Sequence, residues 1–183
     1  MGRRILFLGP PGAGKGTQAA MLATALGVPH VSTGVMLREA VADGTELGRR
    51  AKSIMDGGDL VPDDLVVAIV EERLARDDAA CGYLLDGFPR NVAQAQALTA
   101  ALGDDSVQVA LLLDVDEDEI VDRLMKRAAE GRADDNEDTI RRRFEVYRQE
   151  TEPMVAAYGD KVVAVDGMGA VDDVFAGVVR ALV

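Results

Sequence analysis

The chain is poor in the residues that form disulfides, metal clusters and aromatic surfaces. It has no tryptophan, one cysteine (Cys81) and one histidine (His30), and aromatic residues account for only 4% of its 183 positions. A single cysteine excludes an internal disulfide and is typical of a reducing compartment. One cysteine and one histidine cannot assemble a His/Cys metal site. We expect Cys81 to pack in the core and not to serve as a reactive thiol.

Long apolar runs are also missing. Only Ile5–Leu8 are continuously apolar between the basic N-terminal residues and Gly9. This run is too short for the apolar region of a signal peptide, and no stretch approaches the roughly 18 apolar residues of a membrane span. We therefore expect a cytoplasmic protein without membrane association, and a monomer because no exposed apolar stripe stands out.

Positive charge is scarce, with 20 lysines and arginines against 32 acidic residues and a net charge of −12. This balance argues against a protein that binds nucleic acid through a basic surface. A local concentration of positive charge is therefore informative. One stretch contains Arg123, Lys126, Arg127, Arg132, Arg141, Arg142, Arg143 and Arg148. From composition alone this cluster is either a solvated helix face paired with nearby acids or a functional site.

Short apolar runs alternate with stretches of helical periodicity along the whole chain. The predicted strands are residues 4–8, 30–32, 82–85, 107–113 and 161–165. The predicted helices are residues 14–26, 34–42, 46–55, 62–74, 91–102, 116–127, 138–158 and 171–182. This alternation indicates one α/β domain, with a doubly wound, five-stranded parallel sheet covered by helices on both faces.

Two segments depart from the alternation, at residues 32–62 and 127–137. A doubly wound fold can carry inserted segments at such places, so we expect a core of residues 1–31, 63–126 and 138–183. The glycines of Gly57-Gly58 and Gly131 are candidate hinges, although a simple turn explains each as well. Ligands of such sheets bind at the carboxyl ends of the strands.

The sequence Gly9–Thr17 (GPPGAGKGT) follows the first predicted strand and opens the first predicted helix. Glycines allow backbone N–H groups to approach a triphosphate closely, the helix N-terminus adds partial positive charge, and Lys15 can reach the β- and γ-phosphates. The predicted phosphate ligands are Gly12, Ala13, Gly14, Lys15, Gly16 and Thr17. The loop departs from the usual P-loop pattern because Gly16 stands where a hydroxyl residue belongs, which leaves a direct hydroxyl ligand to magnesium open.

This variant loop resembles that of adenylate kinases, in the nucleoside monophosphate kinase superfamily, and the resemblance continues almost end to end. The supporting motifs are Gly9–Gln18, Ser32-Thr33-Gly34 with Arg38, Asp59-Leu60-Val61-Pro62, Leu85–Arg90, Gly131–Asp135, Arg143 and Asp166-Gly167. The resemblance implies reversible, magnesium-dependent phosphoryl transfer from ATP to AMP, which gives two ADP. A UMP/CMP kinase of the same fold is the alternative.

The resemblance assigns roles to the arginines. Arg38, Arg90, Arg132 and Arg143 look like clamps on the monophosphate and the transferring phosphoryl group, and Arg123 and Arg127 look like ATP-side residues. The acceptor phosphate oxygen is already ionised at neutral pH, so the chemistry needs positive charge and positioning and does not need a general base. We expect Arg141, Arg142 and Arg148 to be solvated or ion-paired.

Asp86 looks like the acidic residue that orients Mg²⁺ through water, and the alternative is a buried N-cap carboxylate. Asp134 and Asp135 match lid aspartates, with loop solubility or ion pairing as an equal alternative. The predicted lid is short, and it lacks the cysteines with which some long-lid relatives bind zinc, so structural zinc is not expected.

The acceptor base is expected to lie against Thr33 and Gln94, because a glutamine amide can both donate to and accept from the adenine edge. UMP/CMP kinases usually carry alanine where Thr33 stands, which favours AMP. Val35 departs from the acidic residue usual in the family, and its effect on AMP affinity is left open. Further AMP contacts are expected from Asp59, Leu60, Val61, Gly87, Phe88 and Pro89, and an ATP-adenine contact from Gly169.

Two other classes of protein are weighed against the kinase. A GTPase-like switch should carry a guanine-reading Asn-Lys-x-Asp segment, and the chain has none. A nucleotide-binding protein without catalysis would be expected to have lost some of the arginines, and it would bind ATP without forming ADP from ATP and AMP.

Overall fold

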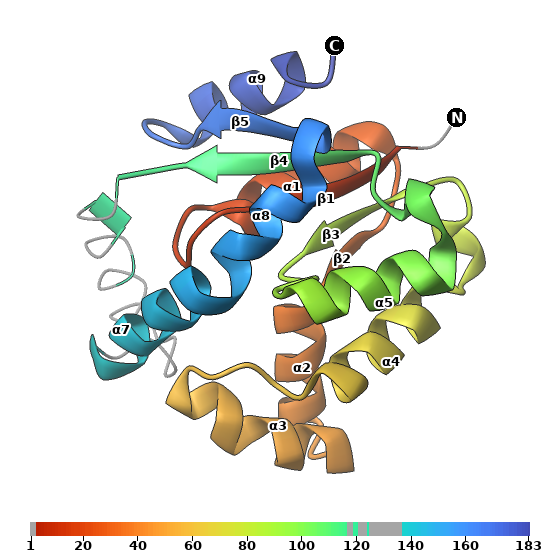
Figure 1. Ribbon diagram of the computed structural model, residues 1–183, viewed down its shortest axis with the longest axis vertical. Coiled ribbons are helices and arrows are strands. Elements are labelled where there is room, and N and C mark those ends of the chain that lie inside the picture. Colours follow the sequence, from red (N-terminus) through yellow and green to blue (C-terminus); the bar gives the residue numbers. More distant parts are fainter. Residues whose placement is uncertain (1–2, 117–118, 121–123, 125–136) are drawn as a thin grey trace.

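The computed structural model describes residues 3–116, 119–120, 124 and 137–183. Its strands are β1 (Arg4–Leu8), β2 (His30–Ser32), β3 (Tyr83–Asp86), β4 (Val109–Asp114) and β5 (Val162–Asp166). All pair in parallel, in the order β2-β3-β1-β4-β5 (Figure 1). The predicted five-stranded parallel sheet is confirmed, and β1, which leads into the glycine-rich loop, is its central strand.

Helices connect and cover these strands. They are α1 (Lys15–Leu26), α2 (Thr33–Ala42), α3 (Glu46–Gly57), α4 (Asp63–Leu74), α5 (Val92–Leu102), α7 (Glu137–Val146), α8 (Glu152–Tyr158) and α9 (Val171–Arg180). Three-residue 3₁₀ turns, which the sequence patterns did not predict, are η1 (Asp77–Ala79), η2 (Asp104–Ser106) and η4 (Gly159–Lys161). The predicted helix at 116–127 lies mostly outside the described residues.

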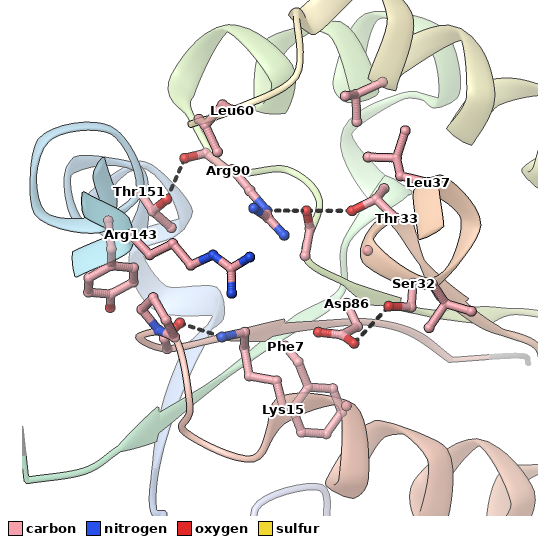
Figure 2. Close-up of a pocket in the computed structure, with 18 of the residues that line it drawn as sticks. Phe7, Lys15, Ser32, Thr33, Leu37, Leu60, Asp86, Arg90, Arg143 and Thr151 are labelled. Atoms are coloured by element: carbon pink, nitrogen blue, oxygen red, sulfur yellow. Dashed lines mark hydrogen bonds between the residues drawn. The ribbon is translucent and has the colours of Figure 1, made fainter. Parts of the chain in front are cut away.

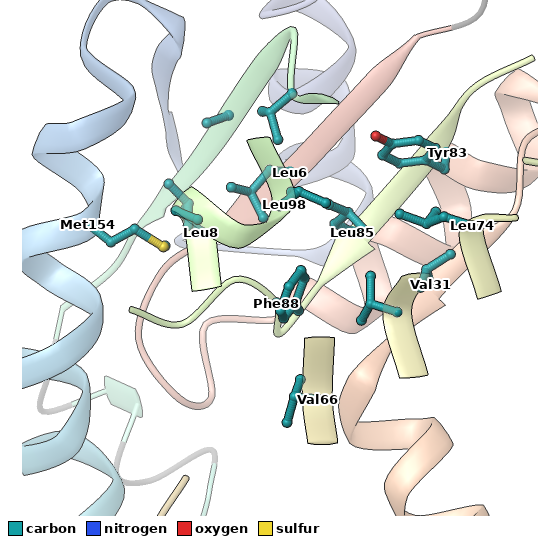
Figure 3. Packing of buried hydrophobic residues seen from close by; sticks show 14 of the residues in the cluster. Leu6, Leu8, Val31, Val66, Leu74, Tyr83, Leu85, Phe88, Leu98 and Met154 are labelled. Carbon is teal, nitrogen blue, oxygen red and sulfur yellow. The ribbon is translucent and has the colours of Figure 1, made fainter. Parts of the chain in front are cut away.

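The alternation of side chains along β1 divides the core into two layers. Ile5 and Phe7 face one side and pack with residues of α1 and α9. Leu6 and Leu8 face the other side and pack with residues of α4, α5 and α8, where Figure 3 shows Leu8 near Met154. Successive side chains of a strand point to opposite faces, so a continuous apolar run is what a strand covered on both sides requires.

The single helix predicted over residues 138–158 is interrupted. Between α7 and α8 the chain forms a π-helical turn, η3 (Tyr147–Thr151). Pro153 stands in the first turn of α8 and has no N–H to donate to a carbonyl one turn earlier. A wider turn before the proline accommodates this missing donor. The residues predicted as helix are therefore helical, with a π turn that the sequence patterns did not predict.

Cys81 is exposed, contrary to the predicted core position. It lies in the turn between η1 and β3, where Gly82 N–H donates to the Ala79 carbonyl. The chain reverses there before the buried strand begins, so the side chain stays at the surface. In the part of the chain that the structure describes, no helix is long and apolar enough to cross a membrane.

Candidate active site

A cavity of about 650 Å³ lies at the carboxyl ends of β1, β2 and β3. Its walls come from the loop after β1, the start of α2, the segment after α3, the turn after β3 and the helical stretch from α7 to η3. Among the predicted site residues, those that line it are Gly12, Gly14, Lys15, Gly16, Thr17, Thr33, Arg38, Asp59, Leu60, Val61, Asp86, Gly87, Pro89, Arg90, Gln94 and Arg143.

The glycine-rich loop forms the floor of this cavity. Gly12 and Gly14 have φ values of 85° and 89°, which side-chain-bearing residues rarely adopt. At Gly12 a Cβ atom would also lie 2.6 Å from Ile120 Cγ2 and 2.9 Å from Leu124 Cγ, so packing beneath the loop excludes a larger residue. Helix α1 starts at Lys15 and has no acidic residue in its first turn, which leaves the helix N-terminus favourable for an anion.

The Lys15 ammonium folds back over its own loop. It donates to the carbonyls of Gly9 at 2.7 Å and Pro10 at 2.8 Å. These bonds hold the positive charge beside the loop amides. A negatively charged ligand in the loop would therefore meet both the ammonium and the helix N-terminus.

Asp86 ends β3 beside the end of β2, since Ser32 and Asp86 are register partners. Ser32 Oγ donates to Asp86 Oδ2 at 3.1 Å, and His30 Nε2 lies 3.3 Å from the same oxygen. Burial raises the pKa of the Asp86 carboxyl, but the His30 hydrogen bond, the Lys15 charge and the Ser32 hydroxyl together outweigh it. The pKa is therefore lowered, and Asp86 presents a negative charge to the cavity at neutral pH.

The turn after β3 places Arg90 over the cavity. Its Nε donates to the Gly87 carbonyl at 2.8 Å, and the Thr33 hydroxyl donates to the same oxygen at 2.7 Å. Thr151 Oγ1 donates to the Arg90 carbonyl at 2.7 Å. The Gly87 carbonyl thus links the Arg90 side chain to Thr33 at the start of α2, and Thr151 of η3 fixes the Arg90 backbone.

Two further arginines reach the cavity from opposite walls. Arg143 extends from α7, and Figure 2 shows its guanidinium group pointing toward that of Arg90, above Lys15 and Asp86. Arg38, on α2, lies over Gly34, where a Cβ atom would be 3.2 Å from one guanidinium nitrogen. Three planar guanidinium groups and one ammonium around one space match a ligand with several phosphates.

The wall formed by Asp59, Leu60 and Val61 contacts α7. Asp59 Oδ1 accepts from Arg142 Nε at 2.7 Å, and Thr139 Oγ1 donates to the Asp56 carbonyl at 3.1 Å. Arg142 is therefore ion-paired, one of the two states expected for it. The segment between β2 and α4 therefore contacts α7 directly, and α7 is the helix that follows the predicted lid.

Some predicted site residues lie elsewhere. Ala13 and Phe88 are buried in the two core layers, and Gly169, between β5 and α9, is not among the described residues that line the cavity. Their predicted nucleotide contacts stay predictions. Those of Arg123, Arg127 and Arg132, together with the assignments of Gly131, Asp134 and Asp135, lie outside the described residues.

Sequence reasoning missed His30, Tyr147 and Thr151 as cavity residues. His30 could have been placed from the pairing of β2 with β3, which is a tertiary fact. Arg143, Tyr147 and Thr151 are spaced four residues apart, which puts side chains on one face of a helix, so this signal was present in the sequence. Burial, with the nearby charges of Glu152 and Asp114, raises the pKa of Tyr147 to about 12.

The doubly wound parallel sheet, the glycine-rich loop after its central strand and the basic cavity above that loop define a P-loop phosphotransferase. The comparisons with known proteins narrow this class. The family model described as adenylate kinase matches residues 7–163.

Three similar proteins are each named adenylate kinase. The one from Maricaulis maris is 53% identical over 183 residues, with 97% of each chain covered. The one from Nocardia farcinica is 51% identical over 181 residues, with 98% of each chain covered. The one from Thermobifida fusca is 50% identical over 176 residues, with 93% of each chain covered. The chain therefore belongs to the adenylate kinase family, and the resemblance inferred from its motifs is confirmed.

Proposed function

We propose that this chain transfers the γ-phosphoryl group of ATP to AMP in a reversible reaction that yields two ADP. The observation that carries the proposal is the shared cavity, in which the glycine-rich loop and Lys15 lie opposite Arg90 and Arg143. One wall suits a triphosphate and the other suits a monophosphate. A protein that only binds a nucleotide has no need of the second wall.

The two walls assign the two nucleotides. ATP would bind along the loop and the N-terminus of α1, where backbone amides converge. AMP would bind beneath the segment of residues 32–62, with its phosphate near Arg38 and Arg90 and its base near Thr33 and Gln94. Leu60 and Val61 supply the apolar surface against which a base can pack.

Catalysis in this arrangement comes from positioning and charge. An AMP phosphate oxygen attacks the γ-phosphorus of ATP in line, the bond to the β–γ bridging oxygen breaks, and ADP leaves. Lys15 would exchange its bonds to the loop carbonyls for phosphate oxygens. Arg90 and Arg143 would neutralise the charge that spreads over the transferring group.

Asp86 fits a role toward a magnesium ion that arrives with ATP. It is a carboxylate with a lowered pKa, it lines the cavity, and a Cβ on Gly16 in the loop would lie 3.4 Å from its Oδ2. One carboxylate suits an ion that is bound mainly by phosphates and water, and such an ion neutralises phosphate charge when bound. Ser32 and His30 orient the carboxylate.

Closure of the segment at 32–62 over the core would exclude water, which protects the phosphoryl group from hydrolysis. The predicted lid at 127–137 lies almost wholly outside the described residues. The contact of Asp59 with Arg142 supports an approach of the first segment to α7. The acidic, cysteine-poor composition supports a cytoplasmic protein that does not bind nucleic acid. The absence of an apolar stripe in the sequence supports a monomer. Size-exclusion chromatography with light scattering would test the monomer.

The deciding experiment is ADP formation from ATP–Mg with AMP, CMP, UMP and GMP measured side by side. Strong preference for AMP is expected. Preference for CMP or UMP would retain the phosphate chemistry and overturn the base assignment to Thr33 and Gln94. No transfer to any acceptor would overturn the enzymatic function.

A further inference from the structure

The side-chain amide of Gln94 has both of its polar atoms bonded within the protein. Gln94 is only 1% exposed, yet it lines the cavity. Its Oε1 accepts from the backbone N–H of Arg90 at 2.8 Å, and its Nε2 donates to Asp63 Oδ1 at 2.7 Å. Asp63 is not among the described residues that line the cavity, so it contacts the site through Gln94.

These two partners permit a single orientation of the amide. An ionised carboxylate only accepts hydrogen bonds, and a backbone N–H only donates. Rotating the amide by half a turn would place Gln94 Oε1 against Asp63 and Nε2 against the Arg90 N–H. Both contacts would then be repulsive in a buried environment, where unmatched polar groups are costly.

Asn91 extends the same network. Its Oδ1 accepts from Gln94 N–H at 2.8 Å as the N-cap of α5, which directs its Nδ2 toward Asp63 Oδ1 and Oδ2 at 3.0 and 3.2 Å. Asp63 therefore accepts hydrogen bonds from two side-chain amides, those of Asn91 and Gln94. It is the first residue of α4, which packs beside α5 (Figure 1).

We propose that Asp63 is a positioning residue that selects a 6-aminopurine over a 6-oxopurine acceptor by fixing the orientation of the Gln94 amide. The inference rests on the proposed function. Oε1 keeps a second lone pair and Nε2 a second hydrogen, so the fixed amide can accept from N6–H and donate to N1 of adenine. A 6-oxopurine presents the reverse pattern, an acceptor at O6 and a donor at N1, and matches only the rotated amide.

The test compares AMP with inosine monophosphate as acceptors, because the two differ only at the edge in question. Asparagine at position 63 can either accept or donate, so Asp63→Asn removes one of the two constraints on the Gln94 amide and leaves the constraint from the Arg90 N–H. We expect the KM for AMP to rise about tenfold with little change in kcat, and the AMP-to-IMP ratio of kcat/KM to fall about tenfold or more.

Asp64→Asn is the matched control. Asp64 is the next residue of the same helix start, it is exposed, and its substitution removes the same charge. We expect the AMP-to-IMP ratio of this variant to equal that of the wild type. Asp63→Ser, whose hydroxyl also accepts or donates and suits a helix start, is a second variant if Asp63→Asn does not fold by circular dichroism.

The outcomes separate the two proposals. A wild-type protein that forms no ADP from ATP and AMP would overturn the proposed function. A wild-type protein that prefers AMP, combined with a folded Asp63 variant that keeps the wild-type AMP-to-IMP ratio, would overturn the role of Asp63 alone. An equal loss of ratio in Asp64→Asn would also overturn it, because the effect would then follow from helix charge.

Discussion

The two walls of the cavity are built in different ways. The loop after β1 is made from consecutive residues, and its shape depends on backbone angles at Gly12 and Gly14. The opposite wall is made from side chains of α2, the turn after β3, α5 and α7, which lie far apart in the sequence. A local backbone motif can be read from the chain directly, whereas a wall of side chains exists only once the sheet has assembled.

The largest effect on turnover is expected at Arg90, in the wall opposite the glycine-rich loop. Arg90→Ala should lower turnover by about 10³- to 10⁵-fold, because no other group replaces a guanidinium in that position. Steady-state ADP formation at saturating ATP and AMP measures it. Arg76→Ala is the control, since Arg76 is an exposed arginine whose closest ion-pair oxygen is 4.0 Å away. A decrease below tenfold in folded Arg90→Ala would remove it from the catalytic residues.

In the wall formed by the glycine-rich loop, substitution should destabilise the fold most at Gly12. Gly12→Ala combines a φ of 85° with a close approach to Ile120 and Leu124, so it should destabilise the fold by about 2–4 kcal/mol. Gly27→Ala tests the backbone angle alone, because Gly27 has a φ of 65° and no neighbouring atom within 4 Å. Gly27→Ala should lower the free energy of unfolding by about 1–2 kcal/mol, measured by urea unfolding. Equal costs at both positions would contradict the packing argument.

Asp86 lines the cavity, and its lowered pKa predicts how the stability of the protein depends on pH. An ionised carboxylate whose pKa is lower in the folded state stabilises the protein above its unfolded pKa, and loses that effect as the pH falls through the folded pKa. The stability difference between wild type and Asp86→Asn should therefore be present at pH 7 and shrink below about pH 4. Urea unfolding at each pH measures it, and a difference independent of pH would contradict the ionised state.

The smallest effect is expected at the ion pair between Asp59 and Arg142. Both side chains are about half exposed, and pairs of this kind contribute little because water and salt screen them. Arg142→Ala should change the KM for AMP by less than about twofold. A larger increase that disappears at high salt would show that contact between the two segments contributes to AMP binding.

Much of the fold was predictable because apolar runs and glycine signals agree locally. β1 and β2 have the predicted bounds, and β3, β4 and β5 begin one or two residues later than predicted. The strand order could not be read, because it depends on pairing between distant segments. The π-helical turn was missed because helical periodicity continues through it, and only Pro153 hinted at the change.

The candidate site divides in the same way. The phosphate-loop residues follow from one motif, and Arg38, Arg90 and Arg143 follow from family resemblance supported by phosphate chemistry. Cys81 was misplaced because its apolar character outweighed the turn signal of Gly82. The partnership of Asp63 with Gln94 was invisible in the sequence, because nothing local relates the first turns of α4 and α5.

The π-helical turn of η3 also has a consequence for insertions and deletions. A π turn contains about one residue more than an α turn, and one residue corresponds to about 100° of rotation about an α-helix axis. Deleting a single residue from Tyr147–Thr151 would tend to restore an α-helical register. Arg143 would then turn away from Arg90 while α8 stayed packed on the sheet. The number of residues between Arg143 and Met154 therefore sets the direction of the Arg143 guanidinium group, although neither residue lies within the π turn.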